Sequence, residues 1–262
     1  MKSRFFILLF GMALFGCSSD DNSGNNNNGT NDFLPQEQGN YWVYDVNSDE
    51  FSGRDSLYVS GTTTSQGNTY YTYLTSEVPN GFYSGLMTSG QSRVSDSKIF
   101  MTGEINIGDV LGDFIEVPSV ELVDFVIFDG GTSQGATLDS ESGSFTIPYN
   151  GFDILVEYTL SAKAGQKYPN YTVSNGDSYE NVQSVTIAVS AKISTSVFGF
   201  PVTILSSQDV ISSTQYYANN VGVVFVNTDF QYQMNAVPGF ELPIPQNFQS
   251  NTTEVLDDYL VE

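Results

Sequence analysis

The stretch Val182–Val197 alternates between apolar and polar side chains, and this alternation constrains the fold more than any other feature of the chain. One set of alternate positions is apolar: Val185, Ile187, Val189, Ala191 and Ile193. The other set carries hydroxyl groups and one lysine: Ser184, Thr186, Ser190, Lys192 and Ser194. A period of two residues places the two sets on opposite faces of a β-strand. The pattern therefore predicts an antiparallel strand with one face in a core and the other in water.

Further segments rich in β-branched and aromatic residues recur along the chain, with turn residues between them, and each is typical of a strand. They are residues 39–46, 55–64, 68–77, 83–89, 92–95, 98–103, 144–149, 152–164, 202–217, 221–227 and 253–259. Val120–Phe128 fits either a buried strand or a helix. Residues 168–180 are polar and contain Asn and Gly, which favours a loop. Since no long amphipathic helix pattern is present, the sequence predicts an all-β fold.

The first seventeen residues have the pattern of an export signal. Lys2 and Arg4 precede an apolar run from residue 5 to residue 15, which is too short to cross a bilayer as a helix. Gly16 directly before the only cysteine, Cys17, resembles a bacterial lipoprotein cleavage site. The resemblance implies that residues 1–16 are a signal peptide and that Cys17 carries the lipid. An ordinary signal peptide with an incidental cysteine is the alternative.

The segment after the cysteine is predicted to be a tether. Residues 18–32 carry no apolar side chain, so we expect residues 17–32 to be a disordered link between a lipidated Cys17 and one all-β domain over residues 33–262. Ser18-Ser19-Asp20-Asp21 resembles the acidic export signal of Bacteroidota surface lipoproteins. This resemblance implies that Asp20 and Asp21 direct the protein to the outer face of the outer membrane.

Composition excludes several function classes. The net charge is −22, and loss of residues 1–16 would leave six basic residues against 30 acidic ones, which argues against binding to nucleic acid. The absence of histidine removes Ser-His-Asp and Cys-His catalysis and His-ligated zinc. The one cysteine is assigned to lipidation, so neither a disulfide nor a thiolate site is expected. We therefore expect no cofactor and no enzymatic activity.

Two short motifs resemble segments of uncharacterised outer-membrane lipoproteins of Bacteroidota. Residues 216–224, YYANNVGVV, match the pattern YYA-x-x-VG-x-V, and residues 39–44, GNYWVY, match G-N-x-W-x-Y. A strand like residues 253–259 usually ends such chains, whereas Asn219-Asn220 departs from the commoner basic-Gly pair. The resemblance implies a single large, strongly curved antiparallel sheet, similar to the half-barrel of lipoprotein carriers, around an apolar concavity. A β-sandwich is the alternative.

Two local patterns resemble a metal site and a glycosylation site. Asp45-x-Asn47-x-Asp49 has the opening spacing of an EF-hand loop, but Glu50 stands where glycine is needed and Ser56 where a bidentate glutamate belongs. We therefore expect a polar strand end and no assigned metal site. Asp55-Ser56-Leu57 resembles the D-S/T-hydrophobic O-glycosylation motif of Bacteroidota, which would make Ser56 a glycosylation site.

Carboxylates and tyrosines offer two further hypotheses. Acidic residues among apolar ones could act as a catalytic pair with a raised pKa, as in glycoside hydrolysis, although isolated strand carboxylates usually point to solvent; they are Glu116, Glu121, Asp124 and Asp153. The clusters Tyr70-Tyr71-x-Tyr73 and Tyr216-Tyr217 place rings on both faces of their strands, so one ring in each would meet solvent or a sugar.

These features together predict a surface-exposed outer-membrane lipoprotein that acts as a non-catalytic binding or structural module. Its membrane contact would be the lipid at Cys17, and its ligand a glycan or an apolar molecule. A carrier of a lipid in the sheet's concavity and a carboxylate-dependent carbohydrate-active enzyme are the alternatives. Trp42, the only tryptophan, is predicted to fill the core and not to line an open concavity.

The lipid anchor is tested by the substitution Cys17→Ala. Because Cys17 is the only thiol in the chain, the substitution should abolish incorporation of a clickable fatty-acid probe in growing cells. A Ser18→Ala variant, one residue further along, is the control and should be labelled normally. Equal labelling of the Cys17→Ala variant and the unaltered protein would contradict the prediction.

Overall fold

The computed structural model of the chain describes residues 32–105, 119–197, 199–237 and 245–262, and 73% of these residues are in strands. In chain order the strands are β1 (Tyr41–Ser48), β2 (Ser52–Ser65), β3 (Asn68–Thr75), β4 (Gln91–Ser95), β5 (Lys98–Ile105), β6 (Val120–Asp129), β7 (Thr137–Tyr149), β8 (Phe152–Thr172), β9 (Ser178–Val197), β10 (Phe200–Ala218), β11 (Gly222–Gln233) and β12 (Asn247–Leu260). One helix, α1 (Phe82–Thr88), lies between β3 and β4.

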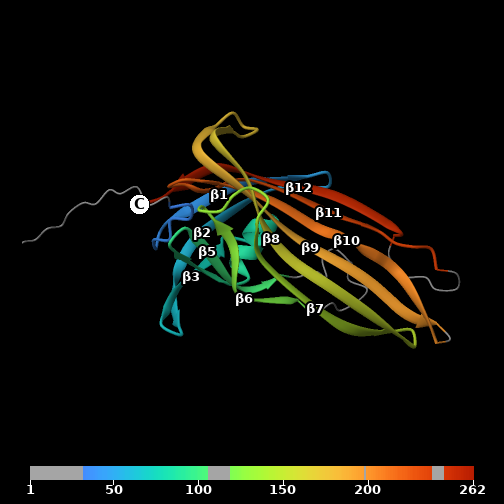
Figure 1. Ribbon diagram of the computed structural model, residues 1–262. Helices are drawn as coiled ribbons and strands as arrows, with labels where there is room; N and C mark the ends of the chain where they lie inside the picture. Colours follow the sequence, from blue (N-terminus) through green and yellow to red (C-terminus); the bar gives the residue numbers. More distant parts are fainter. Residues whose placement is uncertain (1–31, 106–118, 198, 238–244) are drawn as a thin grey trace, which may run out of the picture. The chain divides into compact units, whose positions relative to one another are not determined.

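All twelve strands belong to one antiparallel sheet, in the order β6-β5-β4-β3-β2-β1-β12-β11-β10-β9-β8-β7. Apart from β6 and β7, strands that are consecutive in sequence pair with one another, and the pair β1–β12 joins the two halves (Figure 1). The sheet nearly closes into a barrel. Between β6 and β7 the described residues form no backbone ladder, but the Val126 amide donates a hydrogen bond to the Asp139 carboxylate at 3.0 Å. The expected all-β fold with a single, strongly curved sheet is confirmed, in place of the alternative β-sandwich.

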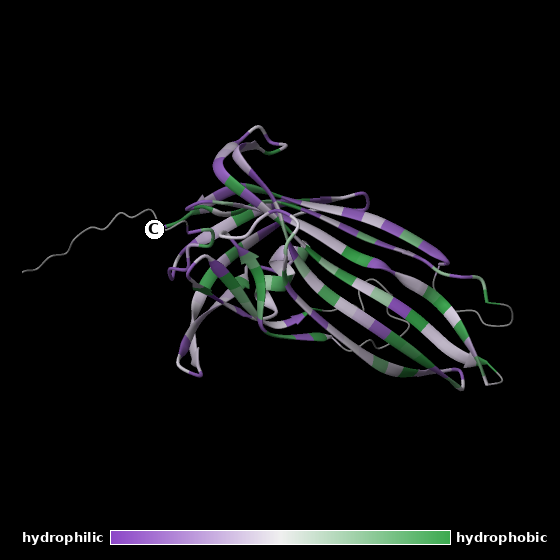
Figure 2. Ribbon diagram, in the orientation of Figure 1, coloured by the Kyte–Doolittle hydropathy of each residue, from purple (hydrophilic) through white to green (hydrophobic). Residues whose placement is uncertain are grey.

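Alternating side chains determine which face of the sheet becomes the core. On β9 the five apolar residues predicted to share one face are all buried, at 0–4% exposure. Figure 2 shows the same alternation as hydrophobic and hydrophilic bands along β8, β9 and β10. Val120–Phe128, for which a strand and a helix both fitted the sequence, is part of strand β6. The apolar faces of neighbouring strands are in register, so they form one continuous core on the concave side.

The two motifs that carry the family resemblance meet in this core. Trp42 and Tyr44 are buried on β1; the indole Nε1 donates to the carbonyl of Val221 at 2.6 Å, and the Tyr44 hydroxyl donates to that of Val223 at 2.9 Å. The ladder between β11 and β12 begins only at Phe225, so these two carbonyls take no part in it. The side chains of Trp42 and Tyr44 therefore donate hydrogen bonds to backbone carbonyls at the point where β12 no longer pairs with β11.

One glycine of the second motif has a direct structural role. Gly222 has φ +107°, a conformation that side-chain-bearing residues rarely adopt, and a Cβ there would lie 2.9 Å from Nε1 of Trp42. The close approach of the indole therefore requires glycine at this position. Trp42 is 1% exposed, as expected for a ring that fills the core.

The prediction of a strand over residues 83–89 is wrong, because residues 82–88 form helix α1. The segment has no side-chain cap of its own at Gly81. Its first amide groups are instead bound by carboxylates from distant strands, as described below. Local propensity therefore gave no sign of the helix, and tertiary contacts decide its structure.

The prediction of a loop over residues 168–180 is also wrong at both ends. Tyr168–Thr172 continues β8 and Ser178–Glu180 continues β9, so the pair forms one long hairpin. Near the turn of this hairpin, Tyr171 stacks on Tyr216 with ring centroids 4.5 Å apart, and the ring centroid of Tyr216 in turn lies 5.5 Å from that of Phe225. Aromatic packing between strands thus orders a segment whose sequence is polar.

The signal peptide, Cys17, Asp20 and Asp21 lie outside the described residues. Asp32, the last residue of the expected tether, is held by the folded part: its carboxylate accepts a hydrogen bond from the Leu34 amide at 3.0 Å, and its carbonyl accepts one from the Asn220 amide at 2.6 Å. In the described part of the chain no helix is long and apolar enough to cross a membrane.

The filled core is tested by Trp42→Ala. Removal of this buried ring should lower the free energy of unfolding by about 3–5 kcal/mol, because it leaves a cavity and an unpaired carbonyl at Val221. Urea denaturation measures the change, with Phe200→Ala as the control, since Phe200 is 73% exposed. A loss below about 1 kcal/mol for Trp42→Ala would show that the ring does not support the core.

Candidate functional site

Two buried carboxylates hold the start of helix α1 against the concave side of the sheet. Asp55 on β2 accepts hydrogen bonds from the amides of Asn80 and Gly81 at 2.8–3.0 Å. Glu254 on β12 accepts from the amide of Tyr83 at 2.7 Å, and from the amide and hydroxyl of Ser84 at 3.2 and 2.9 Å. The two carboxylates together satisfy four backbone amides at the point where the helix begins.

The environment of Glu254 strongly disfavours its charge. The side chain is 1% exposed, and burial raises its pKa to about 7. The hydrogen bonds from Tyr83 and Ser84 act in the opposite direction, whereas the negative charge of Asp55 raises the pKa further. A Cβ at Gly81 would overlap the Glu254 carboxyl group, so glycine is required for this close approach. Glu254 therefore titrates near neutral pH while it holds the helix.

A pocket of about 470 Å³ lies beside this helix, between α1, the β3–α1 connection and the ends of β5, β11 and β12. Most of its lining is apolar: Phe51, Val78, Pro79, Phe82, Leu86, Ile105, Phe230 and Phe248. Glu104 is its one ionisable lining residue among those described. Phe82 of α1 and Phe230 of β11 meet edge to face at a centroid distance of 6.2 Å, which joins the helix to the sheet at the base of the pocket.

Three apolar residues that line the pocket are much more exposed to solvent than the apolar residues of the core. Phe51 is 42%, Val78 86% and Phe248 36% exposed, and all three belong to this one pocket. Large apolar side chains that converge on one concavity are the usual lining of small-molecule sites. The arrangement can enclose an apolar molecule, and it offers no pair of carboxylates for acid–base chemistry among the described residues.

Of the four carboxylates proposed as catalytic candidates, the structure describes Glu121, Asp124 and Asp153. Glu121 and Asp153 are exposed, and Glu116 lies outside the described residues. Asp124 accepts hydrogen bonds from Arg93 at 3.0 Å and from the Tyr70 hydroxyl at 2.9 Å. The hydrogen bond from Arg93 lowers the pKa of Asp124, opposite to the raised pKa that a general acid needs.

The EF-hand-like pattern begins in β1 and runs into the connection to β2, and the glycosylation motif lies within β2. Asp45 on β1 forms an ion pair with Arg54 at 3.0 Å. Ser56 is partly buried on β2, beside the buried Asp55 that binds the start of α1. Within the described ranges no three acidic side chains gather into a group that could hold a metal ion.

The tyrosine clusters are divided between core and surface. Tyr217 is fully buried and Tyr216 is partly exposed on the outer face, within the aromatic contacts described above. Tyr73 is buried, and its hydroxyl accepts a hydrogen bond from Gln36 at 2.8 Å. Neither cluster lines the apolar pocket. The expectation that one ring of each cluster contacts a sugar stays a prediction.

Sequence reasoning missed the residues that matter most in this region, Asp55 and Glu254. Each lies within a strand-like segment, where a carboxylate normally points to solvent. A weak signal exists for Asp55, which shares its strand face with the buried Leu57 and Val59. The pocket has no local signal, because its lining comes from segments between residues 51 and 252.

The role of Glu254 is tested by the pH dependence of stability. Its pKa is about 7 in the folded protein, against 4.5 for an ordinary glutamate, so its contribution is fully present below pH 4.5 and is lost as the pH rises through 7. Between these values the free energy of unfolding should fall by up to about 3 kcal/mol. The Glu254→Gln variant should lack this component, and Glu121→Gln, at an exposed site, should retain it. Parallel pH profiles for the unaltered protein and Glu254→Gln would contradict the assignment.

No family model, curated protein or solved structure matches the chain. The comparisons therefore assign no function to the pocket over α1 or to the carboxylates behind it. What the region does has to be argued from its geometry, namely an apolar concavity whose wall is a short helix held by Asp55 and Glu254.

Proposed function

We propose that the protein is a non-catalytic binding module that holds a small apolar molecule in the pocket over α1. The observation that carries this proposal is the convergence of Phe51, Val78 and Phe248 on that pocket, where each leaves much of its apolar surface exposed. A ligand that covered these side chains would remove apolar surface from water, at about 25 cal/mol per Å².

The size of the space supports a small ligand and not a long lipid. The pocket volume of about 470 Å³ lies at the lower end of the range for small-molecule sites. Elsewhere on the concave side, large side chains occupy the space, among them Trp42, Tyr44 and Tyr83. The proposed ligand is therefore enclosed at one end of the sheet, and the rest of the concavity serves as packed core.

The same proposal includes the anchor and the location. The lipoprotein-type sequence around Cys17 supports attachment to a membrane by a lipid, and Asp20 and Asp21 support display on the outer face of the outer membrane. The resemblance to Bacteroidota lipoproteins belongs to this proposal as well. A module of this kind would bring its ligand to the cell surface without contact between the fold and the bilayer.

Binding can be measured with N-phenyl-1-naphthylamine, a neutral apolar dye whose emission rises in an apolar site. The protein should bind the dye saturably, and the double variant Phe51→Ser/Phe248→Ser should bind it about tenfold more weakly, since two apolar walls are lost. Both side chains are at least 36% exposed, so the variant should fold normally.

The matched control is Phe200→Ser, which removes a 73% exposed phenylalanine outside the pocket. Its affinity for the dye should equal that of the unaltered protein. If the dye does not bind saturably, or if the double variant binds it as tightly as the control does, the apolar-ligand function is wrong.

A further inference from the structure

The outer face of strands β11 and β12 carries a ladder of uncharged polar side chains. The register pairs residues directly across the two strands on this face, and the pairs are Asn227 with Thr253, Asp229 with Asn251, Gln231 with Gln249, and Gln233 with Asn247. Six of these eight side chains are amides and only Asp229 is ionisable. We call these eight residues the amide ladder. In a chain with a net charge of −22, an almost uncharged stripe of this kind is unusual.

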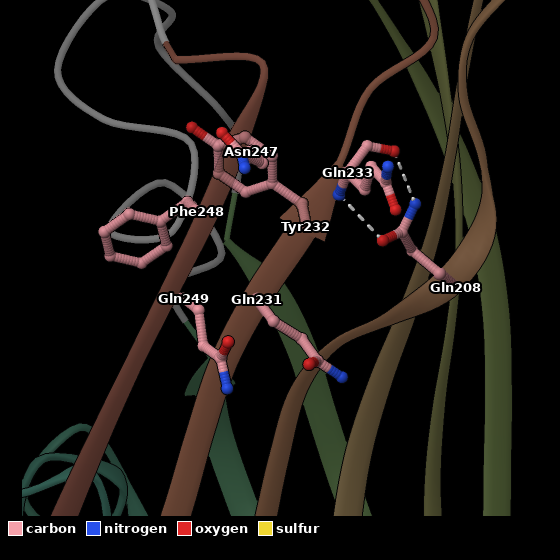
Figure 3. A pocket seen from close by; sticks show the side chains of 7 residues that line it. All are labelled: Gln208, Gln231, Tyr232, Gln233, Asn247, Phe248 and Gln249. Atoms are coloured by element: carbon pink, nitrogen blue, oxygen red, sulfur yellow. Dashed lines mark hydrogen bonds between the residues drawn. The ribbon is translucent and has the colours of Figure 1, made fainter.

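The end of the ladder is hollowed. A depression of about 420 Å³ is lined by five amide residues and by Tyr232 and Phe248, and its lining among the described residues includes no acidic or basic side chain (Figure 3). Tyr232 is 4% exposed, so the polar groups of the amides dominate the accessible surface. Gln231 and Gln249 are paired across the strands in this depression, and both are exposed.

Several amides of the region are fixed in place before any ligand arrives. The side-chain amide of Gln208 donates a hydrogen bond to the backbone carbonyl of Gln233 at 3.0 Å. It also accepts one from the backbone N–H of Gln233 at 2.9 Å, as the dashed lines of Figure 3 show. Asn251 donates to Asn227 at 3.0 Å and to Asp229 at 2.8 Å. Ordered donors and acceptors lose little conformational entropy on binding, which favours recognition by hydrogen bonds.

The ladder leads to the aromatic cluster on the same face. Phe225 lies two residues before Asn227, and β11 alternates its faces, so the ring and the ladder share the outer side. Phe225, Tyr216 and Tyr171 are each partly exposed and in mutual ring contact. From Phe225 to Gln233 the strand extends about 26 Å, at about 3.3 Å per residue.

We propose that this outer surface, from the Phe225 ring along the amide ladder to Gln233, binds a neutral glycan chain. Side-chain amides both donate and accept hydrogen bonds, which matches the hydroxyl groups of sugars. An aromatic ring at one end can pack against the apolar face of a sugar ring. The stripe itself is almost uncharged and therefore suits a neutral ligand. The acidic excess of the whole protein disfavours acidic polysaccharides, because it repels them over a long range. The ladder residues lie on the opposite face of the sheet from the apolar pocket, and the depression shares with that pocket one described lining residue, Phe248.

The test is native affinity electrophoresis of the full-length chain, purified in detergent, through gels that contain dextran, laminarin, galactomannan or polygalacturonate. At least one of the three neutral polysaccharides should retard the protein, and polygalacturonate should not. The variant Gln231→Ala/Gln249→Ala should need about tenfold more of the same polysaccharide for equal retardation, since two paired amides are lost. Gln231→Glu/Gln249→Glu, which keeps the side-chain size and removes the donors, should lose retardation as well.

The matched control is Gln38→Ala/Gln166→Ala, which removes two exposed glutamines outside the ladder and should leave retardation unchanged. Thermal unfolding of each variant confirms that it is folded, which the exposure of both ladder residues leads us to expect. The proposal is overturned if none of the neutral polysaccharides retards the protein, if polygalacturonate retards it most, or if the ladder variants migrate like the control. Phe51→Ser, which changes the apolar pocket and not the depression, should be retarded like the unaltered protein, so failure of the apolar-ligand function would not overturn the glycan site.

Discussion

Hydrogen bonds from Trp42 and Tyr44 tie β1 to the start of β11, across the middle of the curved sheet. Their donors reach the carbonyls of Val221 and Val223, which the β11–β12 ladder does not include. A buried carbonyl without a partner costs about 1–3 kcal/mol, so the rings hold β1 close to β11. The same two rings fill the space that this curvature encloses. The same two side chains therefore tie β1 to β11 and fill the core between them, and neither lines the pocket beside α1.

Helix α1 depends on the sheet more than on its own sequence. Seven residues are too few to form a stable helix alone, and Gly81 provides no side-chain cap. Asp55 and Glu254 supply the missing acceptors from two strands that flank β1. Burial raises the pKa of Glu254 to about 7, and the negative charge of Asp55 acts in the same direction. The wall of the apolar pocket is thus held by a group whose charge is costly.

The parts of this structure that sequence reasoning predicts are those determined within one strand. Alternation gave the buried face of β9, because the pattern depends on a period of two residues, and Trp42 was placed in the core because a lone tryptophan is usually buried. Helix α1 could not be predicted, since the carboxylate of Glu254 lies about 170 residues from the amides that it binds. The hairpin around residues 168–180 was missed for a similar reason, because its order comes from contact between Tyr171 and Tyr216. The apolar pocket and the amide ladder both require strand register, which no single segment contains.

The distribution of charge limits what either face can recognise. Four of the six basic residues beyond the expected signal peptide are already in ion pairs with carboxylates: Arg54, Arg93, Lys98 and Lys192. Of the other two, Lys167 donates to the carbonyl of Gly130 at 2.8 Å. Few cationic groups therefore remain to attract an anion, and the acidic excess repels one. The concave pocket contains one ionisable residue and the amide ladder another, Glu104 and Asp229. This charge distribution therefore favours ligands without a charge. The inner face can bind them by apolar contact, and the outer face by hydrogen bonds to neutral groups.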